Sequence, residues 1–161
     1  GNLWHPLMGC PTKNDPSLLP MVDILVYQSR HFSEVEKLWA KVFPGDPPWN
    51  HAENAIPEKL RVQPELFLVA EAKGNIVGTA MAGYDGHRGW LYTIAVEPSH
   101  QRRGIGSRLL KAAERKLLQM GCKKINLQIR SDNDAVSEFY RCHGYATEER
   151  ISMGKRVFDQ T

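Results

Sequence analysis

The chain has 161 residues, of which 42% are hydrophobic and 24% charged, a mixture typical of a globular domain. A formal net charge of +3 is too small to indicate nucleic-acid binding, and no apolar run approaches the roughly 20 residues that span a bilayer. The three cysteines show no C-x-x-C spacing, which argues against a zinc site. We therefore expect no nucleic acid, membrane or metal among the partners. Because no secretory signal is visible, we expect a cytoplasmic protein.

Residues 1–20 differ from the rest of the chain. They contain scattered prolines and glycines and show no hydrophobic periodicity. We interpret them as a flexible leader, either native or in part a cloning remnant. Regular patterns begin at Val22, and residues 21–161 are predicted to form one domain.

The first half of this domain predicts a strand, two helices and three more strands. Residues 24–27 form a short strand candidate, and the apolar spacing of residues 32–42 is that of a helix. Ser33 and Glu36 have the spacing of a capping box at its start. A weaker helix signal covers residues 53–61, and the last of the following strands is apolar on both faces, as in a central strand. These three strands are predicted at 66–71, 76–84 and 90–96.

The second half gives the strongest helix signal, over residues 104–120, and Gly121 suits the C-terminal cap of that helix. Alternating apolar residues predict a strand over 124–130, and a shorter helix is predicted over 133–143. The chain is expected to end in a strand pair, at 145–147 and 151–158. The order indicates a mixed α/β fold, in which antiparallel strands flank a parallel β-α-β step.

The segment between the strand 90–96 and the long helix is the most informative. It reads Gln101-Arg102-Arg103-Gly104-Ile105-Gly106. The first N–H groups of a helix lack internal partners and carry partial positive charge, so they can bind an anion. Gly104 and Gly106 lack the Cβ atoms that would keep a diphosphate from the backbone. Two glycines near a helix start also occur without any ligand. The P-loop pattern is absent, and the dinucleotide-binding pattern lacks its third glycine.

This loop resembles the Q/R-x-x-G-x-G/A loop of the GNAT superfamily of N-acetyltransferases. The preceding Ile94-Ala95-Val96 and the later Asn133, Tyr140 and Gly144-Tyr145 are similar to the same family, and the likeness extends over about residues 22–158. The hairpin at 83–89 is similar to that of small, little-characterised bacterial members. The resemblance implies a GNAT-like acyl-CoA N-acyltransferase fold, with a central mixed sheet flanked by helices. It implies acetyl-CoA as cosubstrate and an amine as acceptor, and we expect a monomer or a homodimer.

The resemblance also implies which residues bind the cofactor. In such proteins the central strand separates from its neighbour and pairs with the pantetheine arm, a role that falls on the backbone of residues 94–96. The diphosphate is expected on the amide groups from Arg102 to Ser107. Asn133 is expected to contact the CoA arm, although it also suits a helix N-cap. The predicted cofactor-binding residues are Ile94, Ala95, Val96, Gln101, Arg102, Arg103, Gly104, Ile105, Gly106, Ser107, Asn133 and Tyr140.

Acetyl transfer needs a neutral amine, a donor to the developing oxyanion and a proton for the departing thiolate. Tyr140 matches the family's usual general acid, and the alternative is that it only packs its helix on the sheet. The resemblance leaves the identity of the general base open, because Gln128 and Trp90 stand where relatives carry Glu. A weak base favours an acceptor of low pKa, such as an α-amine near 8, over a lysine near 10.4. The predicted catalytic residues are Tyr140, His87 and Asp85, with Glu71 or a water chain as alternative bases.

Three hypotheses of function follow. The first is an N-acetyltransferase that acts on the primary amine of a small molecule or of a peptide or protein N-terminus. The second is a non-catalytic acyl-CoA sensor, supported by the missing acids at Gln128 and Trp90. The third is a nucleic-acid binder that uses the basic residues of 102–115, but that face lacks aromatic residues for base stacking.

Overall fold

A five-stranded sheet in the order β1-β2-β3-β4-β5 forms the centre of the fold in the computed structural model, which describes residues 21–158. The leader predicted at 1–20 lies outside the described residues. The first four strands pair antiparallel with their neighbours, whereas β5 pairs parallel with β4. The predicted mixed α/β sheet is therefore confirmed. The strands are β1 (Val22–Val26), β2 (Phe67–Ala72), β3 (Asn75–Tyr84), β4 (Gly89–Val96) and β5 (Ile125–Leu127).

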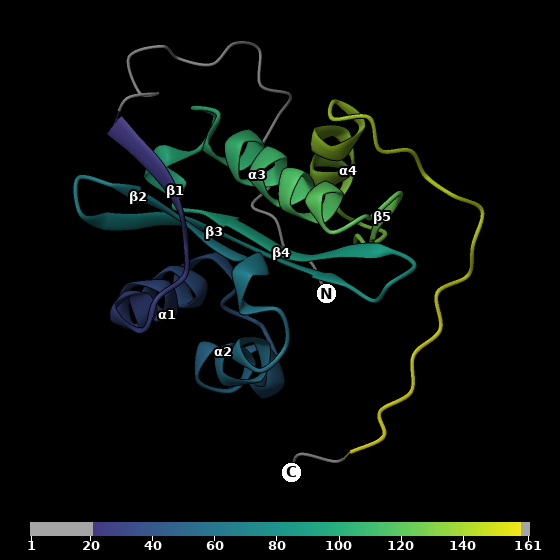
Figure 1. Cartoon of the computed structure of the whole chain (residues 1–161), viewed down its shortest axis with the longest axis horizontal. Helices are drawn as coiled ribbons and strands as arrows, with labels where there is room; N and C mark the ends of the chain where they lie inside the picture. Colours follow the sequence, from purple (N-terminus) through teal and green to yellow (C-terminus); the bar gives the residue numbers. More distant parts are fainter. Residues whose placement is uncertain (1–20, 159–161) are drawn as a thin grey trace.

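Two pairs of helices cover the two faces of this sheet (Figure 1). The helices α1 (Phe32–Val42) and α2 (Ala52–Leu60) lie on one face, and α3 (Ile105–Gln119) and α4 (Asp134–Arg141) lie on the other. Each face has its own apolar core, because alternate residues of a strand point to opposite sides. On β4, Ile94 and Val96 join the core under α3, whereas Ala95 joins the core under α1.

The sequence prediction for the cap of the first helix is wrong. The capping box predicted at Ser33 and Glu36 is absent, because α1 begins at Phe32 with His31 as its N-cap residue and no side-chain cap. A 3-10 turn, Ser29–His31, precedes the helix instead, and the N–H of Gln28 donates to Nδ1 of His31 at 3.0 Å. The chain therefore enters α1 from an existing turn, and the N-terminal cap is not needed at Ser33.

The strand pair predicted at 145–147 and 151–158 does not form. Residues 146–158 are exposed and run outside the sheet (Figure 1). They contact β5 through side chains, since Glu148 accepts from Lys124 and Asn126 at 2.6 Å each. No backbone ladder joins them to β5 among the described residues. The predicted strand pair is therefore wrong, because a strand needs a paired neighbour and none joins residues 146–158 within the described residues.

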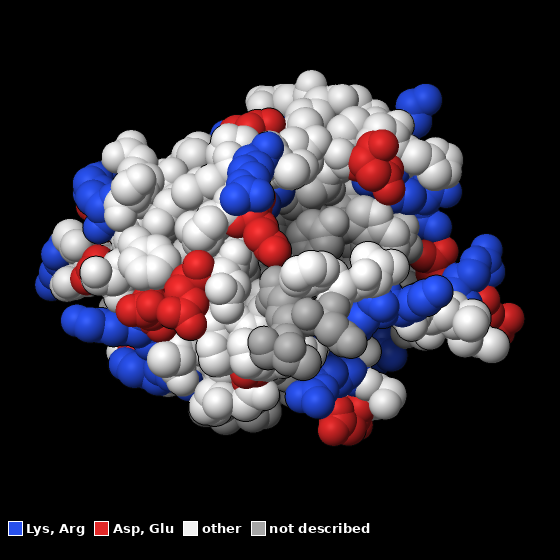
Figure 2. All heavy atoms as spheres, turned by 90° about the horizontal axis from the view of Figure 1, so that it is seen from below, with Lys and Arg blue, Asp and Glu red and all other residues white. Residues whose placement is uncertain are grey.

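Charges of both signs lie on the face of the molecule that Figure 2 shows. On the face seen in Figure 2, basic and acidic side chains alternate among the described residues, so no continuous basic surface covers it. No helix within residues 21–158 is long and apolar enough to cross a membrane. The cytoplasmic location stays a prediction.

Candidate functional site

The strands β4 and β5 share a ladder for only three residue pairs. Residues 89–91 of β4 pair with residues 125–127 of β5, and β5 then ends while β4 continues along β3 to Val96. On the β5 side, residues 93–96 of β4 therefore have no strand beside them among the described residues. The side chains of Ile94, Ala95 and Val96 are buried, so only their backbone can meet a ligand there. This geometry suits the predicted pairing with an extended arm.

A bulge changes the direction of β4 just where the two strands part. Met81 of β3 pairs with Thr93, and Ala82 pairs with Leu91, which leaves Tyr92 as an extra residue on β4. A bulge bends its strand and increases the local twist. Sequence reasoning did not single out Tyr92, because an apolar strand pattern carries no signal for an inserted residue.

The predicted phosphate loop has the backbone expected of an anion site. Gly104 is the N-cap residue of α3 with φ 83°, and no side chain of the described residues caps this helix. Arg102 also has positive φ, at 63°. Successive N–H groups in such a turn form a concave anion site, and the first-turn amides of residues 105–107 point out of the helix. Gly104 suits this backbone because a residue with a Cβ atom would be strained at that φ.

Gln101 provides a second test of whether a ligand fits this loop. Its side chain is buried, and Nε2 donates to the carbonyl of Val96 at 3.2 Å. Its Oε1 is buried with no hydrogen-bond partner among the described residues. An unpartnered buried acceptor is costly, and a ligand N–H beside Val96 would satisfy it. The loop and the end of β4 therefore fit a ligand that carries both a diphosphate and an amide.

The residues before the loop are held by Glu97. Its carboxylate accepts from the Ser99 N–H at 2.7 Å and from Lys41 of α1 at 3.0 Å. Burial alone would raise the pKa of Glu97, but the hydrogen bonds from Ser99 and Lys41 outweigh this and lower the pKa to about 2. An ionised Glu97 thus fixes the start of the loop relative to α1.

The first turn of α3 is tied to the end of α4 by the buried Ser107 and the half-buried His143. Nδ1 of His143 lies 2.8 Å from the Phe139 carbonyl, and Nε2 lies 3.0 Å from Oγ of Ser107. A carbonyl only accepts, so Nδ1 carries a proton, and in the neutral ring Nε2 accepts from the Ser107 hydroxyl. The Ser107 side chain is therefore engaged with α4, and its N–H is the group that remains for an anion. Sequence reasoning missed His143, because only the tertiary structure brings it to the loop.

The predicted basic residues separate into two groups. Arg102 and Arg103 are exposed in the loop. Arg108 points back to the sheet instead, where its guanidinium donates to the Val22 carbonyl at 2.6 Å. Arg108 is therefore engaged in a structural contact and does not belong to a basic surface that could bind nucleic acid.

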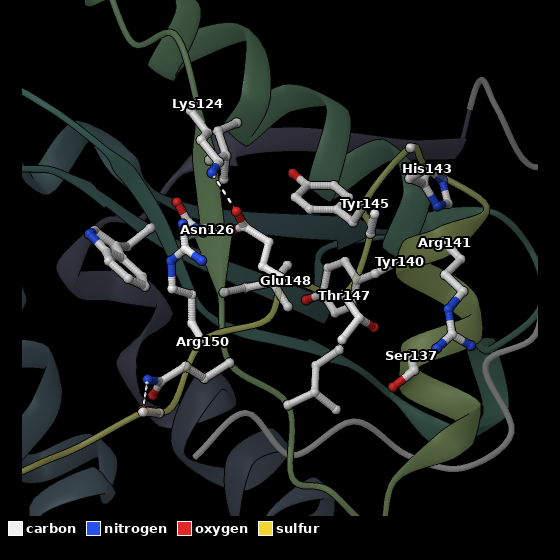
Figure 3. Close-up of a pocket in the computed structure, with 18 of the residues that line it drawn as sticks. Lys124, Asn126, Ser137, Tyr140, Arg141, His143, Tyr145, Thr147, Glu148 and Arg150 are labelled. Atoms are coloured by element: carbon white, nitrogen blue, oxygen red, sulfur yellow. Dashed lines mark hydrogen bonds and ion pairs between the residues drawn. The ribbon is translucent and has the colours of Figure 1, made fainter.

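Tyr140 lies on α4 at the wall of a groove along β5 (Figure 3). Its side chain is 2% exposed and meets the rings of Phe139 and Tyr145 edge to face, with centroids 5.4 Å apart in both pairs. The Tyr145 hydroxyl donates to Glu114 at 2.9 Å, and burial followed by the Glu114 charge raises the pKa of Tyr145. Tyr140 therefore has the packing role considered from the sequence, and its catalytic role stays a prediction.

Asn133 is the N-cap residue of α4. Its Oδ1 accepts from the Val136 N–H at 3.4 Å. This oxygen therefore caps the helix, which is the alternative role considered from the sequence. The contact of Asn133 with CoA stays a prediction.

The hairpin between β3 and β4 holds the other two predicted catalytic residues. The N–H groups of Arg88 and His87 donate to Oδ1 of Asp85 at 2.7 and 2.8 Å, which lowers the pKa of Asp85. Asp85 is thereby engaged in the turn as an ionised side chain, and His87 is exposed at the tip. The hairpin lies at the opposite end of β4 from the phosphate loop, seven residue steps or about 23 Å away. This is the arrangement expected for an acceptor-side loop.

Glu71, the alternative base, lies apart from this region, and Gln128, which stands where relatives carry Glu, is engaged. Glu71 is on β2, near the opposite edge of the sheet, and lies 3.6 Å from His31 and 3.7 Å from Arg30. Gln128 follows β5 and donates to Ser152. No group of three or more potential metal-binding side chains occurs within residues 21–158.

Comparison with known proteins matches the same part of the chain. The sequence model described as "Acetyltransferase (GNAT) family" matches residues 32–145. A Yersinia pestis protein named acetyltransferase is 44% identical over 138 residues, covering 84% of this chain and 96% of the relative. An acetyltransferase of Yersinia enterocolitica is 45% identical with the same coverage. A solved aminoglycoside N-acetyltransferase AAC(6′)-Iy in complex with CoA has a similar fold, with TM-score 0.69, 21% identity and coverage of 85% and 95%.

Proposed function

Because this chain belongs to the acetyltransferase (GNAT) family, we propose that it transfers the acetyl group of acetyl-CoA to a primary amine of a small molecule or of a peptide or protein N-terminus. The observation that carries the proposal is the uncapped N-terminus of α3 beside the open side of β4. Both the family and the similar acetyltransferases support an enzyme over the non-catalytic sensor.

Acetyl-CoA supplies an activated acyl thioester when it is bound. The amide groups of residues 105–107 and the positive end of α3 would hold its diphosphate. The backbone of residues 94–96 would hold the arm, with Gln101 Oε1 as an acceptor beside it. A backbone N–H of β4 such as that of Val96 would stabilise the oxyanion. These roles rest on groups whose hydrogen-bonding capacity is not used by the sheet on that side.

Tyr140 would donate a proton to the departing thiolate, since a phenol is protonated at neutral pH. Asp85 or His87 would position the amine at the other end of β4. The lowered pKa of Asp85 makes it a weak base, so His87 would accept the proton through water. A weak base suits an acceptor whose amine is partly neutral at neutral pH, such as an α-amine.

Two experiments test the proposal. A panel of α-amino peptides, aminoglycosides and small amines should release CoA from acetyl-CoA, and α-amines should be the better acceptors. Calorimetry should show that Gly104→Asp abolishes CoA binding, because it places a carboxylate at the positive end of α3 and a Cβ at positive φ.

The matched control is Gly45→Asp, where an added Cβ meets nothing within 4 Å and which should bind CoA like the wild type. If Gly104→Asp binds CoA as tightly as the wild type, the diphosphate does not bind at this loop. CoA binding without turnover of any amine would support the sensor.

A further inference from the structure

The hydroxyl group of Ser107 is a potential competitor at the anion site of α3. Ser107 is the third residue of this helix, after Gly104 as N-cap residue. A serine side chain can accept hydrogen bonds from nearby backbone N–H groups, and the Cα–Cβ bond of a helical residue points back toward the helix N-terminus. The amides proposed for the diphosphate are those of residues 105–107. A Ser107 oxygen turned toward them would occupy donors that the diphosphate needs.

The structure holds this hydroxyl in the opposite direction. Oγ of Ser107 lies 3.0 Å from Nε2 of His143, which follows the end of α4 (Figure 3). Ser107 is only 3% exposed, so its hydroxyl depends on a protein partner. The hydroxyl donates to His143, and its oxygen is thereby drawn toward α4 and away from the first-turn amides of α3.

His143 is itself held so that it presents an acceptor to Ser107. Its Nδ1 lies 2.8 Å from the Phe139 carbonyl, which only accepts, so the neutral ring keeps its lone pair on Nε2. That carbonyl belongs to the last turn of α4, where carbonyl groups lack partners within the helix. The rings of Phe139 and His143 also pack together, with centroids 4.6 Å apart. These two contacts fix both the position of the imidazole and its tautomer.

We propose that His143 is a positioning residue for CoA: it accepts the Ser107 hydroxyl and so leaves the first-turn amides of α3 to the diphosphate. The inference rests on the proposed function, which places the diphosphate at these amides. His143 acts through Ser107 and does not contact the ligand. Without the imidazole, a buried hydroxyl loses its partner, and the amides of its own helical turn are donors that it can use instead. CoA must then displace the serine oxygen before it binds.

A double-mutant cycle measured by CoA calorimetry tests the proposal, at about pH 8 where an imidazole is mostly neutral. His143→Leu keeps an apolar side chain of similar size but removes the acceptor, and it should raise the Kd for CoA about three- to tenfold, the effect of one competing hydrogen bond. Ser107→Ala removes the competing oxygen and should bind CoA within about twofold of the wild type. The double variant should also return to within about twofold of the wild type, because no hydroxyl is left to compete.

His143→Gln is the matched control, since its amide oxygen can take the place of Nε2 as acceptor for Ser107, and it should bind CoA more tightly than His143→Leu. Steady-state kinetics give a second readout: His143→Leu should raise the KM for acetyl-CoA and leave kcat at saturating acetyl-CoA close to the wild type. A loss of kcat with unchanged KM would overturn the proposal.

The double variant separates this role from a simple tie between two helices. If it binds CoA as weakly as His143→Leu, the pair only holds α3 and α4 together and the proposal is wrong. Wild-type affinity in His143→Leu would also overturn it. Gly104→Asp distinguishes this failure from failure of the proposed function. If Gly104→Asp abolishes CoA binding and the double variant is not restored, only the role of His143 is wrong. If Gly104→Asp binds CoA like the wild type, both proposals fail.

Discussion

Gly78 of β3 lies where the sheet packs against the start of α3. A Cβ atom at this position would lie 2.9 Å from Cδ1 of Leu109, 3.1 Å from the carbonyl oxygen of Ala95 and 3.3 Å from Cγ2 of Ile105. All three neighbours are buried, so none can move aside into solvent. Gly78→Ala must therefore displace the first turn of α3 from the sheet or disturb the β3–β4 ladder.

The size of the effect follows from this crowding. Adding a methyl group to a filled core costs about 1–3 kcal/mol. For a chain of this length each kcal/mol lowers the melting temperature by about 2–4 °C, so Gly78→Ala should lose about 2–12 °C. Ile105 begins the turn whose amides face the diphosphate, so we expect CoA affinity to fall up to about tenfold, or about 1.4 kcal/mol.

Chemical denaturation and CoA calorimetry measure both effects. Gly45→Ala is the control, because an added Cβ there meets nothing within 4 Å and φ is not positive. This control should stay within about 0.5 kcal/mol of the wild type. If Gly78→Ala is as stable as Gly45→Ala and binds CoA equally well, the close packing of β3 on α3 does not position the loop, and the reasoning fails.

Three further predictions concern the chemistry and pH. Tyr140→Phe should lower kcat by about 10²–10⁴ with CoA affinity unchanged, and wild-type turnover would leave Tyr140 a packing residue. His87→Ala should raise the acceptor KM or remove the lower-pH limb of the rate profile; if neither changes, the hairpin is structural. The folded pKa of Glu97 is about 2 against 4.5 unfolded, so its stabilisation is complete above pH 4.5 and lost as pH falls toward 2. The free energy of unfolding of Glu97→Gln, measured by urea denaturation, should depend less on pH between 4.5 and 2 than that of the wild type. An identical pH dependence in the two proteins would contradict this reasoning.

The long elements could be predicted from the sequence because burial decides them. The strands β2, β3 and β4 and the helices α1 and α3 lie within a few residues of their predicted ranges. Their apolar residues recur with the period of the element, and that periodicity is local information. The capping box of α1 was mispredicted, although its range was not, because the N-cap depends on the turn before the helix, where His31 accepts from Gln28.

Some features of the candidate site could likewise be predicted from the sequence, and others could not. The loop at 101–107 was predicted from glycine positions, and the positive φ of Gly104 agrees with that prediction. The Ser107–His143 pair could not be predicted, because its members lie 36 residues apart and meet only after α4 packs on α3. The bulge at Tyr92 also depends on pairing between strands, which a single strand pattern does not specify.

The C-terminal segment shows what a strand pattern can and cannot establish. Alternating apolar residues give 151–158 the capacity to pair, but pairing requires a neighbour with an open edge. Residues 148 and 152 meet residues 124, 126 and 128 only through side chains, and no backbone ladder joins the segment to β5 among the described residues. The strand predicted over 151–158 is therefore wrong, because a local pattern of apolar residues does not specify the neighbour that a strand needs.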